Sequence, residues 1–447
     1  MTATDDALNL LDGLIAKAKA AGADAADSLL AHSVALSHAQ RLGELERLER
    51  EESQDLGLRV FVGRRQAIVS SSDNSPAALD ELVDRALAMA RSVPEDPHCG
   101  LADPAELAKA PPKLDICDDI EPAAETLIER ATACEDAARA VSGITNSEGA
   151  EAGWSLSRIA LAASNGFAGG YAVSRHSLGV SVLAGEGLDM ERDYEFSTQV
   201  YGADLEDPAE VGRKAAERTL RRLGARKAAT GRVPVVFDPR VSGGLIGHLA
   251  GAINGVAVAR GTSFLKDKLG ERIFAPGITI VDDPHRPRGL RSKPFDGEGV
   301  ANGRLDVIAD GRLTTWILDL ASARQLGLKT VGRAARGTSS PPGPATTNLY
   351  LEPGPLSPAE LMADIKEGFY VTEMMGMGVN GVTGDYSRGA AGFWIENGEL
   401  AYPVSEMTVA GNLKDMFPKL TPANDLEFRY GTNAPTLRIE GMTAAGA

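Results

Sequence analysis

The chain has 447 residues, of which 43% are hydrophobic and 24% are charged, and its formal net charge is −16 at pH 7. A chain of this length buries a large core and is expected to hold two or more domains. The negative charge argues against nucleic acid or an anionic membrane as the main partner. The three cysteines form no CxxC pair, which argues against a disulfide framework or a zinc knuckle and fits a reducing cytoplasm.

The first third of the chain predicts mixed helix and strand. Apolar residues at helical spacing predict a helix over 4–21, capped by Thr4 or Asp5, and the acidic start does not fit a secretory signal. A strand is expected over 25–39. Residues 42–51 are ambiguous, because leucines spaced three apart favour a helix, whereas a long charged strand is equally tenable.

The following elements are predicted from the spacing of apolar residues and from glycines and prolines that mark turns and loops. In chain order they are a hairpin of strands 56–62 and 66–71, a helix from Ser75 to about Ala90, a proline-rich connection over 94–122, a helix over 123–141, an antiparallel meander over 143–201 and a helix over 208–223.

The most unusual stretch follows a predicted buried strand at 233–238. Glycines recur every four residues along a predicted helix over 241–259, at Gly243, Gly247, Gly251 and Gly255. Each interior glycine costs a helix about 1 kcal/mol relative to alanine, so we expect another backbone to pack closely against this face. The stretch carries no charged residue, but its glycines and His248 favour a buried core helix over a membrane span.

The remaining elements complete an α+β fold with two domains and large antiparallel sheets packed by helices. They are a strand at 278–281, two strands joined by a turn within 296–313, a loop at 341–344, a helix at 357–366 and a glycine-rich region over 376–398. The expected divisions are an N-terminal α/β domain (1–93), the proline-rich connection (94–122), a central helix and meander (123–225) and a β-rich C-terminal domain with the glycine helix (226–447).

The six histidines give no metal-binding pattern. A zinc helix of the HExxH type needs two histidines one turn apart with a glutamate beside them, and no two histidines of this chain are so spaced on a predicted helix. His248 is followed by Leu249 and has no second histidine on its helix. We therefore expect His248 to be a core or cleft histidine, with a substrate contact as the minor alternative.

Other catalytic patterns are equally incomplete. There is no GxSxG nucleophile motif, and the adjacent His98 and Cys99 lie in the proline-rich connection. The run 378–389 is glycine-rich but lacks the GK[ST] ending of a phosphate loop, so its glycines are expected to permit turns and close backbone approach. Four acids, Asp282, Asp283, Asp296 and Glu298, offer general acid/base chemistry, but acids at strand ends more often cap turns. The residues alone therefore indicate no recognisable combination of catalytic residues.

Seven short motifs occur in an order that resembles the TldD/PmbA family, and specifically its PmbA (TldE) branch. They are RVFVG (59–63), SNGF (164–167), GTSFL (261–265), DGEG (296–299), GDYSRG (384–389), GFWIENG (392–398) and AGNL (410–413). No single motif is diagnostic, but the seven together span nearly the whole chain.

The resemblance implies a heterodimeric, cytoplasmic, zinc-dependent peptidase that trims unfolded peptides, matures some peptide antibiotics and removes some antitoxins. In the TldD branch the helix corresponding to 241–259 carries HExxxH, and a late cysteine completes the metal site. This chain has neither the glutamate nor the second histidine around His248, and no cysteine after Cys134. The resemblance therefore implies the non-catalytic subunit, with no metal or cofactor of its own.

The partners implied are a TldD-type catalytic subunit that holds the zinc and unfolded peptide substrates, with neither nucleic acid nor membrane. No residue is assigned a catalytic role, and His248, Glu298 and Arg388 are the candidates for lining a substrate cleft. Two alternatives stay open: a protein-binding modulator related to gyrase or antitoxins, without peptidase activity, and an independent hydrolase that uses Asp296, Glu298 and His248.

Overall fold

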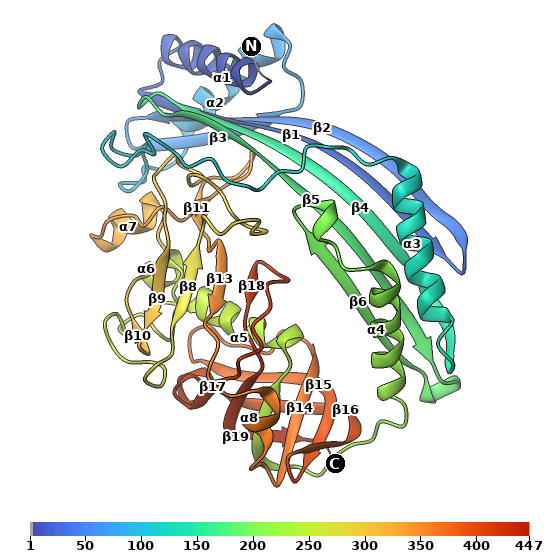
Figure 1. Ribbon diagram of the computed structural model, residues 1–447. Helices are drawn as coiled ribbons and strands as arrows, with labels where there is room; N and C mark the ends of the chain where they lie inside the picture. Colours follow the sequence, from blue (N-terminus) through green and yellow to red (C-terminus); the bar gives the residue numbers. More distant parts are fainter. Residues whose placement is uncertain (1–2, 447) are drawn as a thin grey trace.

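The computed structural model describes residues 3–446. The first half of the chain forms a six-stranded antiparallel sheet in the order β3-β2-β1-β4-β5-β6, which arches over the rest of the molecule (Figure 1). Its strands are β1 (Ala25–Arg41), β2 (Glu44–Val62), β3 (Arg65–Ser71), β4 (Ile144–Ala163), β5 (Ala168–Ala184) and β6 (Glu191–Gln199). The central pairing of β1 with β4 joins segments on the two sides of the proline-rich connection into one sheet.

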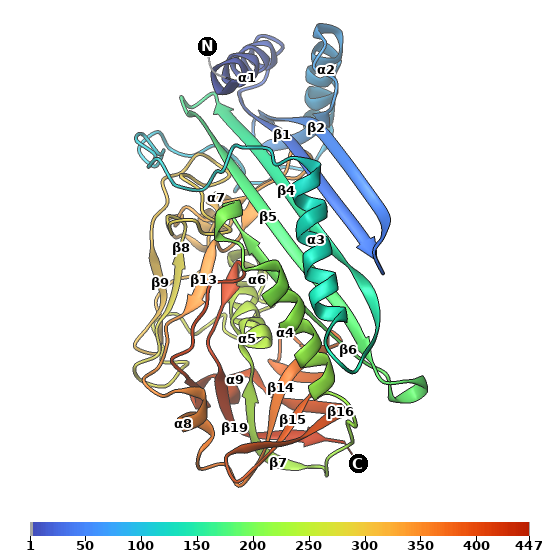
Figure 2. The same cartoon turned by 45° about the vertical axis from the view of Figure 1, so that its right-hand side comes forward.

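Four helices cover one face of this arched sheet (Figure 2). They are α1 (Ala3–Ala20), α2 (Pro76–Ser92), α3 (Ala124–Arg139) and α4 (Pro208–Arg221). Side chains alternate along a strand, so Leu30 and Val34 of β1 point to the same face; Leu30 packs in the core with α1 and α2, and Val34 in the core with α3 and α4. The opposite face carries small residues such as Ser33 and Ser157, and it faces the C-terminal half.

In the ambiguous stretch 42–51, residues 42–43 form a turn and the rest belongs to strand β2, which starts at Glu44. β2 pairs with β1 along its whole length, whereas β3 pairs only with residues 56–62. Residues 44–55 therefore form an open edge within the part of the chain that the structure describes. The leucines that favoured a helix, Leu42, Leu45 and Leu48, are 45%, 63% and 46% exposed. Their spacing of three therefore marks no buried face, and the long charged strand is confirmed.

Most other elements of the first half are confirmed. Ser75 caps α2 by accepting a hydrogen bond from the amide of Ala78. The capping prediction for the first helix is wrong, because α1 already begins at Ala3 and includes Thr4 and Asp5. No helix within residues 3–446 is long and apolar enough to cross a membrane.

The C-terminal half contains two further large sheets. One has the order β10-β9-β8-β13-β18, and the other has the order β16-β15-β14-β7-β19-β17. In the second sheet β16 also pairs with β19, so five of its strands close on themselves around an apolar core. The strands are β7 (Gly231–Phe237), β8 (Ile280–Asp283), β9 (Leu305–Ala309), β10 (Arg312–Leu313), β13 (Asn348–Leu351), β14 (Glu367–Met375), β15 (Asp385–Glu396), β16 (Glu399–Asn412), β17 (Leu420–Pro422), β18 (Thr432–Asn433) and β19 (Leu437–Ala445).

Short helices and one small ribbon complete this half: α5 (Pro239–Ala252), α6 (Gly255–Ala259), α7 (Leu320–Leu326), α8 (Pro358–Met362) and α9 (Leu413–Met416), with β11 (Ala334–Ala335) paired to β12 (Gly343–Pro344). The predicted loop at 341–344 thus supplies a two-residue strand. The helix expected over 357–366 is shorter than predicted, although Ser357 caps it with Glu360 as its partner.

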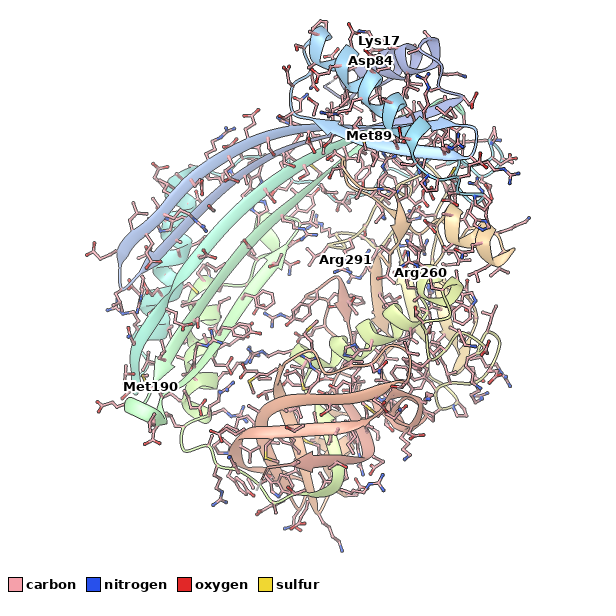
Figure 3. All side chains as sticks on the ribbon, turned by 180° about the vertical axis from the view of Figure 1, so that it is seen from behind. Lys17, Asp84, Met89, Met190, Arg260 and Arg291 are labelled. Carbon is pink, nitrogen blue, oxygen red and sulfur yellow. The ribbon has the colours of Figure 1, made fainter. Side chains whose placement is uncertain are left out.

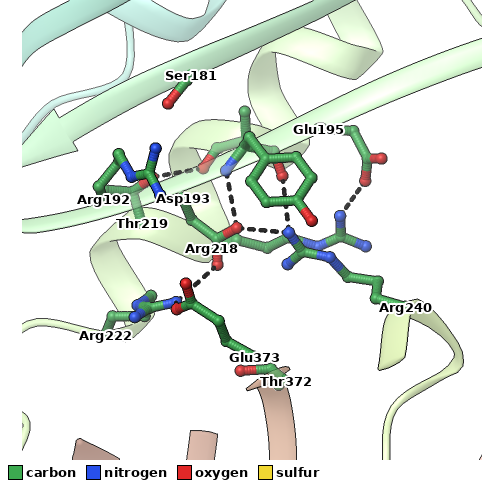
Figure 4. Close-up of polar contacts among 12 residues, drawn as sticks. Ser181, Arg192, Asp193, Glu195, Arg218, Thr219, Arg222, Arg240, Thr372 and Glu373 are labelled. Atoms are coloured by element: carbon green, nitrogen blue, oxygen red, sulfur yellow. Dashed lines mark hydrogen bonds and ion pairs between the residues drawn. The ribbon is translucent and has the colours of Figure 1, made fainter. Parts of the chain in front are cut away.

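The two halves are connected by largely buried charges at the edge strand β6 (Figure 4). Arg240 of α5 donates to Asp193 of β6 over 2.7 Å and lies over the ring of Tyr194. Arg222, just after α4, is 3.6 Å from Asp193 and 2.6 Å from Glu373 of β14. Helix, sheet edge and C-terminal half therefore share one network of ion pairs.

A second contact lies along the neighbouring strand. Arg175 of β5 donates to the carbonyl of Leu290 over 2.8 Å. Figure 3 shows the next residue, Arg291, on the side of the C-terminal half that faces the arched sheet. The inner face of the arched sheet and the C-terminal half thus face each other and are in contact at this point.

Candidate functional site

The glycine helix starts where the buried strand β7 ends. Asp238 follows β7, and its side chain accepts a hydrogen bond from the amide of Arg240 over 2.9 Å, which caps α5. Pro239 takes the first helical position, where its missing N–H costs nothing. The hydroxyl of Tyr370 donates to the same carboxylate over 2.8 Å. The predicted order of strand and then helix is confirmed.

The helix predicted over 241–259 is in fact two helices. α5 ends at Ala252, and α6 restarts at Gly255, capped by the side chain of Asn254. The break occurs because the amide of Gly255 pairs with the carbonyl of Ile317 over 2.8 Å instead of continuing the helix. A side chain at Gly255 would meet Ser322 and Leu318, so close packing is the role of this glycine.

The four glycines therefore do not share one function. A β-carbon at Gly243 would lie only 2.8 Å from the carbonyl oxygen of Thr432, so the close packing expected of the glycine face is present here. At Gly247 and Gly251 a β-carbon would meet nothing within 4 Å. The expectation of close packing along the whole face is wrong for these two, which instead leave space beside the helix.

That space is a pocket of about 350 Å³. Its walls come from α5, α6, the segment that follows α6, the loop between β14 and β15, β15 itself and α9. The lining residues are mostly small or apolar: Gly247, His248, Gly251, Ala252, Ala257, Thr262, Phe264, Gly376, Met377, Val379, Gly381, Arg388 and Leu413. We call this hollow the glycine pocket.

His248 and Arg388 supply the polar groups of greatest chemical interest in the glycine pocket. The His248 ring lies edge-on to Tyr386, with centroids 5.8 Å apart, and its Nε2 atom is buried without a hydrogen-bond partner among residues 3–446. Burial, helped by the charge of Arg388, lowers the pKa of His248. Arg388 uses its Nε to donate to the carbonyl of Gly376 over 3.0 Å. Burial raises the pKa of Tyr386 to about 12, so this phenol stays protonated.

The glycine-rich run beside the pocket forms a turn as far as Gly384, and strand β15 begins at Asp385. The side chain of Asn380 accepts hydrogen bonds from the amides of Val382 and Thr383, and its carbonyl accepts one from Gly384. These amides are already used within the loop. They are therefore not free to cradle a phosphate.

The residues do not fit a metal centre. Residues 3–446 contain no group of three or more histidines, cysteines, aspartates or glutamates placed to hold an ion. Beside α5 the donor set is the single imidazole of His248, and the neighbouring guanidinium of Arg388 would repel a cation. No chemical step is therefore assigned to a metal bound by this chain.

The four acids highlighted in the sequence are engaged in structural contacts. Asp282 accepts hydrogen bonds from Arg333 and Thr347, and Asp283 accepts one from the amide of His285. Both carboxylate oxygens of Asp296 accept backbone amides. Asp283 and Asp296 thus hold turns, as expected, whereas Asp282 forms a buried ion pair with Arg333.

Glu298 lies apart from His248 and Arg388. Its carboxylate accepts a hydrogen bond from Leu320 at the start of α7 over 2.9 Å and lies 3.8 Å from the guanidinium of Arg59. It is 7% exposed and does not line the glycine pocket. The structure thus brings two of the three cleft candidates together and gives no geometric support to a hydrolytic trio of Asp296, Glu298 and His248.

The burial of Glu298 leads to a testable pH dependence. Burial raises the pKa of Glu298 to about 8, above its ordinary value of 4.5. The folded state then holds a proton that the unfolded state releases, so stability is full below the ordinary pKa and falls as the pH rises toward 8. We expect Glu298→Gln to remove this loss. The measurement is urea unfolding of both proteins across this range, and an identical pH dependence in both would contradict the assignment.

Sequence reasoning missed several walls of the pocket. Phe264 and Leu413 occur in the motifs GTSFL and AGNL, but neither motif indicated a pocket, and Met377 was not singled out at all. The one usable signal was the pair Gly247 and Gly251, since glycines inside a helix leave either a close contact or an empty space. Only the three-dimensional structure distinguishes these two outcomes.

Comparison with known proteins agrees with this architecture. Models of the PmbA/TldA metallopeptidase family match residues 30–90 with domain 1, 117–223 with the central domain and 230–446 with the C-terminal domain. The chain is 42% identical to metalloprotease PmbA of Escherichia coli O157:H7, over 95% of this chain and 92% of that protein. It is 36% identical to the PmbA homolog of Haemophilus influenzae, over 92% and 90%.

Two solved structures have the same fold. A proposed modulator of DNA gyrase from Bacteroides thetaiotaomicron superposes with a TM-score of 0.91 at 30% identity and full coverage of both chains. TldE from Thermococcus kodakarensis superposes with a TM-score of 0.87 at 20% identity, covering 98% of this chain and 100% of that one. By sequence and by fold, this chain belongs to the PmbA/TldD family of metallopeptidases, on its PmbA (TldE) branch.

Proposed function

We propose that this chain is the metal-lacking, non-catalytic subunit of a heterodimeric TldD/TldE zinc peptidase that acts on unfolded peptides in the cytoplasm. The observation that carries the proposal is the donor set beside α5. One imidazole, His248, and one guanidinium, Arg388, line the glycine pocket, whereas a peptidase zinc needs three protein ligands. The zinc and the hydrolytic water belong to the TldD-type partner.

The role of this subunit is to complete the substrate chamber. The inner face of the arched sheet carries small polar residues such as Ser33 and Ser157 and faces the C-terminal half. Residues 44–55 of β2 have no strand partner on their outer side among the described residues. An extended peptide binds such an edge through its own backbone. These features support a peptide-holding role that requires no ligand for a metal.

Reconstitution tests the proposal. The purified chain alone should contain no stoichiometric zinc and should not cleave an unfolded peptide such as reduced casein fragments. Adding a TldD-type subunit that carries HExxxH should give a stable heterodimer and robust, chelator-sensitive cleavage. Zinc at one equivalent together with robust cleavage by the isolated chain would refute the proposal.

A second candidate is a protein-binding modulator without a peptidase role. It is favoured by the description of the Bacteroides relative as a proposed modulator of DNA gyrase. Affinity purification of the tagged chain from its own cells separates the two. A TldD-type partner in the eluate supports the peptidase complex, and gyrase without such a partner supports the modulator.

A further inference from the structure

We propose that the glycine pocket, with Arg388 at its polar end, binds the C-terminal residue of a peptide, with the carboxylate on Arg388 and an apolar side chain beside Gly247 and Gly251. The proposal deepens the function proposed above, because it takes peptides as the ligand from there. It names which end of the peptide this subunit recognises.

The first argument is the charge of Arg388. Its guanidinium lines both the glycine pocket and an adjoining hollow of about 330 Å³ at β6 and β14. Within residues 3–446 it has no carboxylate within ion-pair distance. Its Nε donates to the carbonyl of Gly376 over 3.0 Å, and its guanidinium also hydrogen-bonds the hydroxyl of Tyr386. The remaining N–H groups are the natural donors to an incoming carboxylate, which a guanidinium can bind through two parallel bonds.

The second argument is the contrast with the other arginines around the adjoining hollow. Arg192 pairs with Glu148, Arg222 with Glu373, and Arg240 with Asp193. Each of these cations is already neutralised by the protein. Arg388 is the arginine of this hollow whose charge is left uncompensated among the described residues.

The third argument is the shape and polarity of the glycine pocket. Phe264, Val379 and Leu413 give it apolar walls, and the missing side chains of Gly247 and Gly251 leave it open along α5. A single cation beside apolar walls matches a carboxylate attached to an apolar group. A phosphate would need more donors than one arginine supplies.

The binding test uses the isolated full-length chain and a short fluorescent peptide that ends in leucine, prepared as the free acid and as the C-terminal amide. Fluorescence anisotropy should show the acid binding at least about tenfold more tightly than the amide, the range of a charge-assisted hydrogen bond. Equal affinities would overturn the proposal.

Two variants connect the effect to the site. Arg388→Gln should lower binding of the acid to the level of the amide, and Arg388→Lys should retain part of the preference. Arg272→Gln is the matched control, because Arg272 lies elsewhere and pairs with Asp310. A preference for the acid that survives Arg388→Gln would overturn the assignment of Arg388.

The apolar part of the site is tested by filling the pocket. Gly251→Leu has room for its β-carbon and should weaken the peptide ending in leucine by about tenfold, while a peptide ending in glycine is affected much less. Gly13→Leu, in an exposed and equally open position of α1, is the control. Thermal unfolding verifies that each variant is folded. Undiminished binding of the leucine peptide by folded Gly251→Leu would overturn the pocket assignment.

A third arm separates peptides from other apolar carboxylates. Octanoate should compete weakly with the peptide acid; competition as strong as that of the unlabelled peptide would overturn the peptide assignment in favour of small carboxylates. No arm requires the TldD-type partner. Failure here leaves heterodimer formation untouched, and failure to form the heterodimer leaves the binding result untouched.

Discussion

Replacing Arg333 with methionine is expected to destabilise the protein by about 3–5 kcal/mol, because it leaves the buried carboxylate of Asp282 without its positively charged partner. Arg333 and Asp282 are both fully buried and form an ion pair. The guanidinium also donates to the carbonyls of Gly303 and Val331, over 2.6 and 3.2 Å. Urea unfolding of the two proteins gives the difference in free energy.

The control for this change is an exposed arginine with acidic neighbours. Arg304 lies 3.2 Å from Asp306 and 3.1 Å from Glu352, but its side chain is 52% exposed. Solvent screens such pairs, so Arg304→Met should cost less than about 1 kcal/mol. Comparable losses in the two variants would show that burial does not set the energy of the Arg333 contact.

The second large effect is expected at Gly212 of α4. An alanine β-carbon there would overlap the carbonyl oxygen of Cys134 in α3, so the two helices could not keep their present distance. We expect Gly212→Ala to destabilise the protein by about 3 kcal/mol. Gly247→Ala, at an open position of α5, should instead be neutral or stabilise it by up to about 1 kcal/mol.

A thiol provides a local readout of the same contact. Cys134 is fully buried, and burial raises its pKa to about 12, so it should resist alkylation in the native protein. Separation of α3 from α4 in Gly212→Ala should make Cys134 reactive, as peptide mapping by mass spectrometry can detect. Unchanged labelling together with unchanged stability would mean that the helices absorb the extra methyl group without moving apart.

The sequence predicted local elements where apolar spacing agreed with burial. The helix ending near Ala90 and the helix over 208–223 are present as α2 and α4 because their apolar residues face the arched sheet. Residues 42–51 stayed ambiguous, because their conformation is decided by pairing with β1 and not by their own side chains.

The candidate site was predictable only in part. His248 and Arg388 were identified from the sequence, and the fold places them in one pocket. Glu298 came from a motif whose acids cap turns, and the chain carries no local sign of that role. The role of a helical glycine depends on the atoms opposite it, which belong to residues such as Thr432 or Cys134 that are distant in sequence.

The pairing of β1 with β4 also affects how the protein folds while it is made. Asp27 pairs with Ala163, so the centre of the arched sheet cannot form until the ribosome has passed the proline-rich connection and α3. At roughly 5–20 residues per second, synthesis of the intervening segment takes on the order of 10 s. During that time the edge of β1 that later pairs with β4 is open, and apolar side chains such as Val34 remain exposed until α3 covers them. The nascent N-terminal segment is therefore prone to aggregation until β4 and α3 have been made.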